Sequence, residues 1–159
     1  MTIHKDCLIC KRIALIKKKK NPYFVIELET GYVVIGDYQF YKGYSLFLCK
    51  KHTDELHKLP KKFRMKFLEE MSLLGEAVYK AFNPEKLNYE ALGNTDRHLH
   101  WHIFPRYKND IDKNRVTWVV DKSIRYSKKA KLNKKELEKL KSELLMEIIK
   151  LKVVPDKVY

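Results

Sequence analysis

Three histidines stand at alternate positions in one short apolar run of this chain. The segment is His98-Leu99-His100-Trp101-His102-Ile103-Phe104, and the whole sequence contains 6 histidines. Successive side chains of a β-strand point to opposite faces, so the three imidazoles are expected to share one face. Leu99, Trp101 and Ile103 would then pack on the other face. The pattern predicts a strand with one apolar side and one side that can do chemistry.

Three interpretations fit such a strand. The histidines can be scattered on a solvent-facing surface, they can bind a catalytic zinc ion that keeps an open fourth position, or one of them can act as a nucleophile. In the third case a neutral imidazole attacks phosphorus or an acyl carbon, while its neighbours hold its tautomer and neutralise charge on the leaving group.

The overall composition predicts one folded domain. The chain has 159 residues, of which 45% are hydrophobic and 12% aromatic. This composition is sufficient for a sizeable core, and the length is too short for two domains of ordinary size. No apolar run approaches the roughly 20 residues of a membrane helix, and no secretory signal is recognisable. We therefore expect a cytoplasmic protein without a membrane partner.

The chain is strongly basic, with 34 Lys and Arg residues against 20 Asp and Glu residues and a formal net charge of +14. This excess favours anionic partners, either nucleotides or nucleic acid. The lysines are spread out in short clusters such as residues 17–20, 61–62 and 134–135, which is typical of a solvated surface. Only the stretch 125–129, Arg-Tyr-Ser-Lys-Lys, indicates a basic and aromatic nucleic-acid-binding surface.

Side-chain patterns predict the strands that surround the histidine segment. Residues 24–28 and 32–35 are rich in β-branched and aromatic residues and are separated by a short turn, which predicts an antiparallel hairpin. Further strands are expected over residues 44–49, 87–92 and 98–104. A short helical turn is expected over residues 11–16.

Two amphipathic helices are also predicted. The first follows Pro60 and ends at Asn83-Pro84, and its apolar stripe consists of Phe63, Phe67, Met71, Leu74 and Val78. The second begins after Asn133, with Glu136 three residues later, and stops before Pro155. Its stripe consists of Leu137, Leu140, Leu144 and Ile148. Packing the first helix on the apolar side of the histidine strand gives an α+β fold, an antiparallel five-stranded sheet backed by a helix, plus a C-terminal helix.

Cys7 and Cys10 form a Cys-x-x-Cys pair, whereas Cys49 lies in an apolar run. Three cysteines are too few for a disulfide framework, and Cys49 is expected to be a small buried hydrophobic residue. The pair can be a redox centre, a metal clip or accidental. The thioredoxin-like alternative lacks its βαβ context, and a tetrahedral zinc ion needs two further ligands.

The histidine segment, continued by Phe104-Pro105-Arg106, resembles the motif of the histidine triad (HIT) family of nucleotide hydrolases and transferases. The stretch 42–52, Lys-Gly-Tyr-Ser-Leu-Phe-Leu-Cys-Lys-Lys-His, is similar to the family's glycine, apolar strand and basic-histidine segment. With the Cys-x-x-Cys pair, the resemblance spans about residues 7–108 and points to the diadenosine polyphosphate hydrolase-like branch with a zinc site. It implies a nucleotide-binding catalytic domain over residues 1–110, a helical extension over 111–159 packed on it, and a homodimer by analogy.

The resemblance implies roles for individual residues. His100 would be the nucleophile that attacks the α-phosphorus of a nucleotide, and His102 would hydrogen-bond the phosphate or the bridging oxygen. Asn94 matches an amide side chain on the phosphate, and Asp37 matches a carboxylate that accepts from ribose hydroxyls. Tyr44 stands where many relatives carry a histidine, and a tyrosine can donate to phosphate but cannot be protonated like imidazole.

In zinc-containing branches of this superfamily, the other ligands are the histidine after the basic segment and the first histidine of the triad. Carried onto this sequence, the expected ligands of a structural zinc ion are Cys7, Cys10, His52 and His98. His4 and His57 are rival ligands that we expect to be ordinary surface histidines. The closed site would fix the backbone around His100.

The resulting hypothesis is a hydrolase that cleaves at the α-phosphate of dinucleoside polyphosphates or nucleoside phosphoramidates through a nucleotidyl-histidine intermediate. A phosphorylase or nucleotidyltransferase on the same scaffold is an alternative, and it differs in the acceptor. A second alternative is a basic nucleic-acid-binding module that removes adenylate from nucleic-acid ends. A nucleotide sensor with negligible turnover is a third. Arg106 and Lys108 can approach a polyphosphate chain or be solvated at a strand end.

Overall fold

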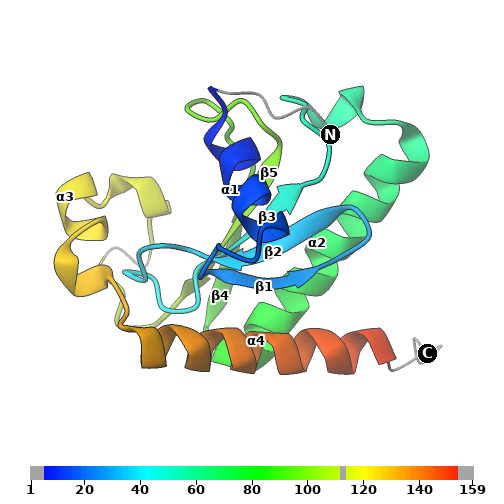
Figure 1. The fold of residues 1–159 in the computed structure, drawn as a ribbon. Helices are drawn as coiled ribbons and strands as arrows, with labels where there is room; N and C mark the ends of the chain where they lie inside the picture. Colours follow the sequence, from blue (N-terminus) through cyan, green and yellow to red (C-terminus); the bar gives the residue numbers. More distant parts are fainter. Residues whose placement is uncertain (1–5, 112–113, 154–159) are drawn as a thin grey trace.

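The computed structural model describes residues 6–111 and 114–153. It contains a five-stranded antiparallel sheet with helices packed on both faces (Figure 1). The strands are β1 (Phe24–Glu27), β2 (Gly31–Ile35), β3 (Ser45–Cys49), β4 (Lys86–Glu90) and β5 (His100–Arg106), in the order β1-β2-β3-β5-β4. The helices are α1 (Leu8–Lys17), α2 (Lys61–Phe82), α3 (Lys122–Arg125) and α4 (Lys134–Val153). Short 3₁₀ turns occupy Leu56–Lys58, Thr117–Val119 and Lys128–Ala130. The predicted α+β fold is confirmed.

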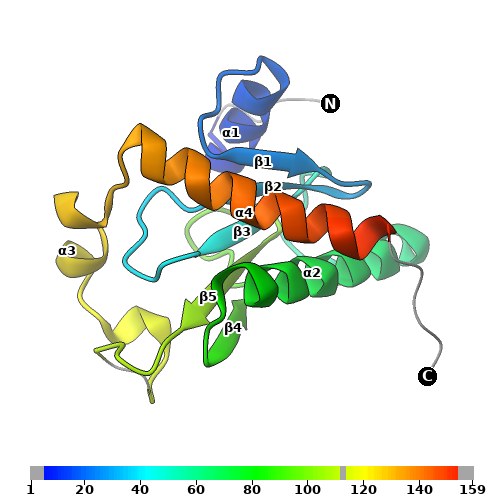
Figure 2. The same ribbon diagram turned by 90° about the horizontal axis from the view of Figure 1, so that it is seen from below.

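Helices α2 and α4 lie beside each other across one face of the sheet (Figure 2). The fully buried members of the predicted α2 stripe are Phe67, Leu74 and Val78. The Phe67 ring stacks on Phe47 of β3, with centroids 4.9 Å apart. Leu99 and Ile103 belong to this core and Trp101 packs against it, so the apolar side of the histidine strand faces the helices as predicted. The α4 stripe adds Leu137, Leu140, Leu144 and Ile148.

Capping residues mark the start of α4 and the end of α2. At the start of α4, the Glu136 amide donates to Asn133 Oδ1 at 3.0 Å and the Asn133 amide donates to Glu136 Oε2 at 2.9 Å. This is the reciprocal capping box that the sequence predicts. Helix α2 ends at Asn83, whose φ of 47° is left-handed, a conformation that asparagine tolerates. Within the described residues, no helix is long and apolar enough to cross a membrane.

Helix α1 covers the opposite face of the sheet and builds a second core with β2 and β3. Its buried side chains are Ile9, Cys10, Ile13 and Ile16. The helix is longer than the predicted turn over 11–16, because Cys7 caps its N-terminus: Sγ of Cys7 accepts from the Cys10 amide at 3.3 Å.

Every strand forms near its predicted range, but at least one end of each is displaced by one or two residues, and the histidine strand continues to Arg106. The histidine strand begins at His100 and not at residue 98, because its partner β3 ends at Cys49. The preceding backbone is held by other contacts: the His98 amide donates to Asp96 O at 2.7 Å, and the Leu99 amide donates to Thr53 O at 2.6 Å. Strand β4 ends at Glu90, which is its last residue paired with β5.

A buried carboxylate joins α2 to the turn between β1 and β2. The Glu70 side chain accepts from the backbone amides of Glu29 at 2.8 Å and Thr30 at 2.9 Å, and also from the Thr30 hydroxyl. These donors satisfy the charged group although Glu70 is only 6% exposed. The contact fixes the hairpin over the helix.

Candidate functional site

His100 and His102 point toward the α1 side of the sheet, and their Nε2 atoms lie 3.0 Å apart. Nδ1 of His100 lies 2.6 Å from the backbone oxygen of His98. A carbonyl oxygen only accepts, so Nδ1 of His100 carries the proton and donates it. The other ring nitrogen, Nε2, then keeps its lone pair, which is the form of imidazole that can attack an electrophile.

The remaining tautomers follow from this one. Since Nε2 of His100 accepts, Nε2 of His102 donates to it, and Nδ1 of His102 accepts from the Tyr44 hydroxyl at 2.6 Å. Burial raises the pKa of Tyr44 well above its ordinary value, so the hydroxyl keeps its proton. Burial, and secondarily repulsion from His100 whenever both rings are protonated, lowers the pKa of His102 to about 3. The hydrogen-bonded series from Tyr44 to the His98 carbonyl oxygen therefore orients both imidazoles, and His102 is uncharged at neutral pH.

Aromatic rings fix the plane of His102. Tyr44 stacks on Phe104 with centroids 4.2 Å apart, and His102 stacks on Phe104 at 5.7 Å. The indole of Trp118 meets His102 edge-on at 5.6 Å. These contacts restrict rotation of the His102 ring, because each rotation would break a packed surface.

Two hollows flank the histidine pair. The first, of about 260 Å³, lies toward α1, and its apolar walls come from Leu8, Ile9, Val34, Leu46 and Leu48. The second, of about 360 Å³, lies between residues 92–96 and the segment that contains Trp118, Lys122 and Tyr126. His100, His102, Asp96 and Tyr126 line both hollows. The two imidazoles therefore stand where the two hollows adjoin.

Asp37 lies in the first hollow and Asn94 in the second, as side chains that can contact a ligand. Asp37 also receives a bidentate ion pair from Arg12 of α1, at 2.7 and 2.5 Å. This hydrogen bond raises the pKa of the Arg12 guanidinium. Arg12 was not predicted as a site residue, because its only signal in the sequence is a cation two residues after the Cys-x-x-Cys pair.

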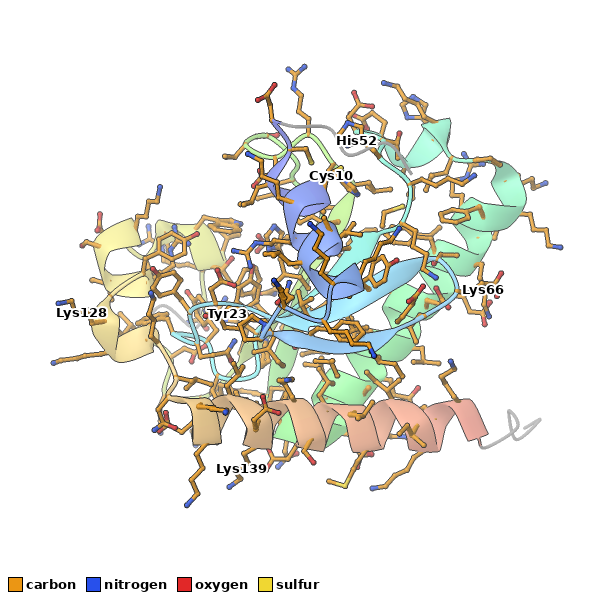
Figure 3. All side chains as sticks on the ribbon, viewed as in Figure 1. Cys10, Tyr23, His52, Lys66, Lys128 and Lys139 are labelled. Atoms are coloured by element: carbon orange, nitrogen blue, oxygen red, sulfur yellow. The ribbon has the colours of Figure 1, made fainter. Side chains whose placement is uncertain are left out.

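The four predicted metal ligands come together in a cluster that adjoins His100 through His98. The ligand atoms of Cys7, Cys10, His52 and His98 all lie within 4.8 Å of one another. Figure 3 shows Cys10 and His52 at the same end of the molecule, while the labelled lysines point away from its body. His57 is exposed, as predicted. His4 lies outside the described residues.

The distances within this cluster fit a tetrahedral zinc ion. Cys10 Sγ lies 3.4 Å from His52 Nδ1 and 3.5 Å from His98 Nδ1, and the two Nδ1 atoms are 3.2 Å apart. Zinc bonds of about 2.3 Å to sulfur and about 2.0–2.1 Å to nitrogen give tetrahedral edges of about 3.5 Å and about 3.3 Å. His98 donates from Nε2 to Cys49 O at 2.8 Å, which leaves Nδ1 as the ligand atom. With four protein ligands, a zinc ion here would be structural.

This arrangement argues against the alternative in which all three histidines of the segment bind one catalytic zinc ion. Nδ1 of His98 faces the two cysteines, whereas Nδ1 of His100 donates to the His98 carbonyl oxygen and is not available to a metal ion. His98 therefore belongs to the cluster with the two cysteines, whereas His100 and His102 form a separate pair.

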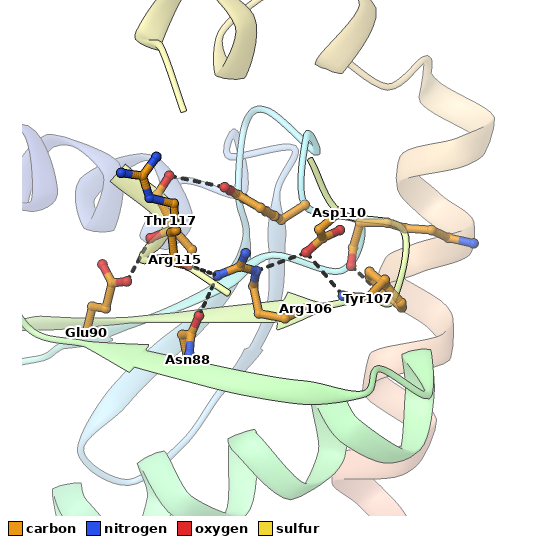
Figure 4. Close-up of polar contacts among 9 residues, drawn as sticks. Asn88, Glu90, Arg106, Tyr107, Asp110, Arg115 and Thr117 are labelled. Atoms are coloured by element: carbon orange, nitrogen blue, oxygen red, sulfur yellow. Dashed lines mark hydrogen bonds and ion pairs between the residues drawn. The ribbon is translucent and has the colours of Figure 1, made fainter. Parts of the chain in front are cut away.

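The suggestion that Arg106 approaches a polyphosphate is wrong. Arg106 is only 4% exposed, and its guanidinium donates to Asp110 Oδ2, to Asn88 Oδ1 and to the Arg115 carbonyl oxygen at 2.8–2.9 Å (Figure 4). These acceptors lie at the end of β5 away from the histidine pair. Arg106 instead holds the chain that follows β5 against the sheet. Lys108 is exposed, in accordance with the alternative of a solvated strand end.

Comparison with known proteins identifies the family. The HIT domain profile matches residues 17–109. This chain belongs to the HIT family. Among curated relatives, an uncharacterized HIT-like protein of Borreliella burgdorferi is 26% identical over 112 residues, covering 66% of this chain and 78% of the relative. The protein named hit of Bacillus subtilis is 26% identical over 108 residues, covering 65% of this chain and 72% of the relative.

Solved structures of HIT proteins share the fold. A hypothetical histidine triad nucleotide-binding protein of Sulfolobus tokodaii superposes with a TM-score of 0.70 at 20% identity, covering 94% of this chain and 99% of that one. A zinc-bound histidine triad family protein of Mycobacterium smegmatis gives a TM-score of 0.60 at 18% identity, covering 89% and 94%. The HIT profile ends at residue 109, so the segment with Trp118, Lys122 and Tyr126 lies outside the matched residues.

Proposed function

We propose that this HIT protein is a nucleotide hydrolase that cleaves at the α-phosphate of dinucleoside polyphosphates or nucleoside phosphoramidates. The observation that carries the proposal is the tautomer of His100, whose Nδ1 is bonded to the His98 carbonyl oxygen and whose Nε2 lone pair lies between two hollows. A neutral, oriented imidazole is the form required for nucleophilic attack on phosphorus.

The reaction would proceed in two displacements. Nε2 of His100 attacks the α-phosphorus, and a phosphorus–nitrogen bond forms while the bond to the leaving group breaks. The ring of the intermediate carries a positive charge, which the His98 carbonyl oxygen stabilises through Nδ1–H. Water then attacks phosphorus, the phosphorus–nitrogen bond breaks, and a nucleoside monophosphate and a proton are released.

His102 has to change its partner during this reaction. Its Nε2 proton points at the lone pair of His100 in the structure, and substrate must replace that contact. His102 Nε2–H then donates a hydrogen bond to a phosphate oxygen or to the bridging atom, where negative charge develops. The bond from Tyr44 to Nδ1 of His102 keeps the proton on Nε2 throughout.

The nucleoside is assigned to the first hollow and the leaving group to the second. Apolar walls suit a base, and Asp37 can accept from ribose hydroxyls through the lone pairs that Arg12 does not use. Asn94, exposed beside the second hollow, can donate its amide to a phosphate oxygen. The family resemblance supports both assignments, and the zinc cluster would hold the frame on which they depend.

A substrate panel with a His100→Asn variant tests the proposal. The panel contains mono- and dinucleoside polyphosphates of adenine and guanine, nucleoside phosphoramidates and adenylated DNA, each with and without added phosphate. The unaltered protein should release a nucleoside monophosphate from a polyphosphate or phosphoramidate without added phosphate. The variant should be slower by about 10³-fold or more and keep its thermal stability, with His57→Asn as the matched control.

Other outcomes identify the alternatives. A requirement for phosphate would indicate a phosphorylase, and turnover confined to adenylated DNA would indicate the nucleic-acid module. Tight nucleotide binding with negligible turnover would indicate a sensor. Near-normal rates in the His100 variant would show that the nucleophile is another group.

We also infer that two copies of the chain pair through the sheet. Strand β4 forms one edge of the sheet, and its Tyr89 side chain is 44% exposed there. An edge strand can extend the sheet by pairing with its own copy. Light scattering of the purified protein should give twice the chain mass, and a monomer at micromolar concentration would overturn the inference.

A further inference from the structure

Three side chains outside the residues that the HIT profile matches line the second hollow beside the histidine pair. Trp118, Lys122 and Tyr126, here called the C-terminal wall, face residues 92–96 across this space. Tyr126 also borders the first hollow, so the wall reaches the point where the two spaces meet. The wall therefore lies on the side of His102 through which a leaving group would depart.

The C-terminal wall is anchored to the sheet. The Thr117 hydroxyl donates to Glu90 Oε1 at 2.7 Å, and the Trp118 indole donates to the other oxygen of Glu90 (Figure 4 shows the Thr117 contact). Glu90 pairs with His102 in the register of β4 and β5. The Tyr41 hydroxyl also donates to the Thr117 carbonyl oxygen at 3.1 Å. Because this segment is already held against the sheet beside His102, its side chains would lose little conformational entropy when they contact a ligand.

The wall offers a cation to the second hollow. Lys122 lines the hollow, with its ammonium 5.7 Å from the Tyr126 ring centroid, and within the described residues it forms no ion pair. The carboxylates nearby are Asp96, which also lines the hollow, and Glu90, whose oxygens are occupied by Thr117 and Trp118. The guanidinium of Arg125 lies behind the wall, 4.6 Å from the Trp118 ring centroid. The second hollow thus offers a ligand one ammonium, from Lys122, and two aromatic rings, beside the single carboxylate of Asp96.

The geometry points to Lys122 as a specificity-determining residue that contacts phosphate on the leaving group. This inference rests on the proposed function and selects between the two substrate classes left open there. A polyphosphate leaving group carries several negative charges, which an unpaired ammonium attracts, whereas the amine released from a phosphoramidate carries none. Lys122 therefore favours nucleoside and dinucleoside polyphosphates over phosphoramidates.

Three substrates with the same adenylyl group and different leaving groups test this role. They are diadenosine tetraphosphate, adenosine 5′-tetraphosphate and adenosine 5′-phosphoramidate, which would release ATP, triphosphate and ammonia. We expect Lys122→Gln to lower kcat/KM for both polyphosphates by about tenfold and to change it less than about twofold for the phosphoramidate. Lys122→Arg keeps the charge and should keep the preference. Lys128→Gln removes an exposed lysine that lines neither hollow and is the matched control.

Salt provides a second measurement. The effect of Lys122→Gln on the polyphosphates should shrink as ionic strength rises, because salt screens an exposed charge. An equal loss on all three substrates, or no loss on any, would overturn the role of Lys122 while leaving the hydrolase intact. If the unaltered protein cleaves none of the three substrates, the proposed function itself fails.

Discussion

The backbone carbonyl oxygen of His98 accepts the Nδ1 proton of His100 at 2.6 Å. The imidazole of His98 in turn offers Nδ1 to the cysteine cluster and donates from Nε2 to Cys49 O at 2.8 Å. One residue thus joins the candidate metal cluster, through its side chain, to the candidate nucleophile, through its backbone. A displacement of His98 that alters its place in the cysteine cluster would therefore also displace the backbone carbonyl oxygen that orients His100.

Removal of metal should therefore affect both stability and turnover. We expect about one equivalent of zinc per chain, and chelation or a His98→Asn substitution should lower Tm by about 6–12 °C, corresponding to about 3 kcal/mol. Turnover should fall as well, because His100 loses its fixed partner. Elemental analysis, thermal unfolding and kinetics measure the three effects. Less than about 0.2 equivalents of zinc, with no loss of stability on chelation, would contradict the structural zinc site.

The hydroxyl of Tyr44 should matter more to catalysis than to folding. In Tyr44→Phe, Nδ1 of His102 loses its donor, so its proton is no longer confined to Nε2. We expect kcat/KM to fall about tenfold and stability to fall by about 1 kcal/mol. Tyr107→Phe is the control, because its hydroxyl is also a hydrogen-bond donor but donates to the Lys42 carbonyl oxygen, at 2.9 Å, outside the two hollows. Equal kinetics in the two variants would contradict the assigned tautomer.

The sequence was sufficient to predict the elements whose signals are local. The stripe of α2, the capping box at Asn133 and the alternation of the histidine strand each depend on neighbours within a few residues, and each is found as expected. Cys49 is buried as predicted, and burial raises the pKa of its thiol to about 11. The cluster of Cys7, Cys10, His52 and His98 could be predicted because the family resemblance indicated which residues combine. Periodicity alone does not give this combination.

The features that were missed depend on contacts between distant segments. Arg106 was treated as a strand-end cation, but its partners include Asn88 and Arg115, which only the folded sheet brings to it. Trp118 and Lys122 were not identified, because nothing in their local sequence indicates that Glu90 holds this segment beside the histidine pair. Long-range contacts of this kind leave no local periodicity.

Partly buried, uncharged His102 makes stability depend on pH. Its pKa is 6.5 when unperturbed and about 3 in the folded chain, so between these values the unfolded chain binds a proton that the folded chain excludes. The free energy of unfolding should therefore fall as pH falls from about 6.5 to about 3, by on the order of 2 kcal/mol at pH 5. Urea unfolding at pH 7 and pH 5 measures this loss. It should be smaller in His102→Gln and unchanged in His57→Gln, and an undiminished loss in His102→Gln would assign the acid sensitivity to other groups.

The Glu70 carboxylate provides a test of stability that is separate from catalysis. Glu70→Ala leaves the amides of Glu29 and Thr30 and the Thr30 hydroxyl without their acceptor in a buried setting. We expect a loss of about 2–4 kcal/mol in the free energy of unfolding. Glu69→Ala, one residue earlier on the same helix, removes a carboxylate that is 65% exposed and should cost less than about 0.5 kcal/mol. Because Glu70 and His100 lie on opposite faces of the sheet, kcat at 25 °C should stay within about twofold of the unaltered protein in both variants. A large fall in kcat without unfolding would show that the helix face and the histidine pair are coupled through the sheet.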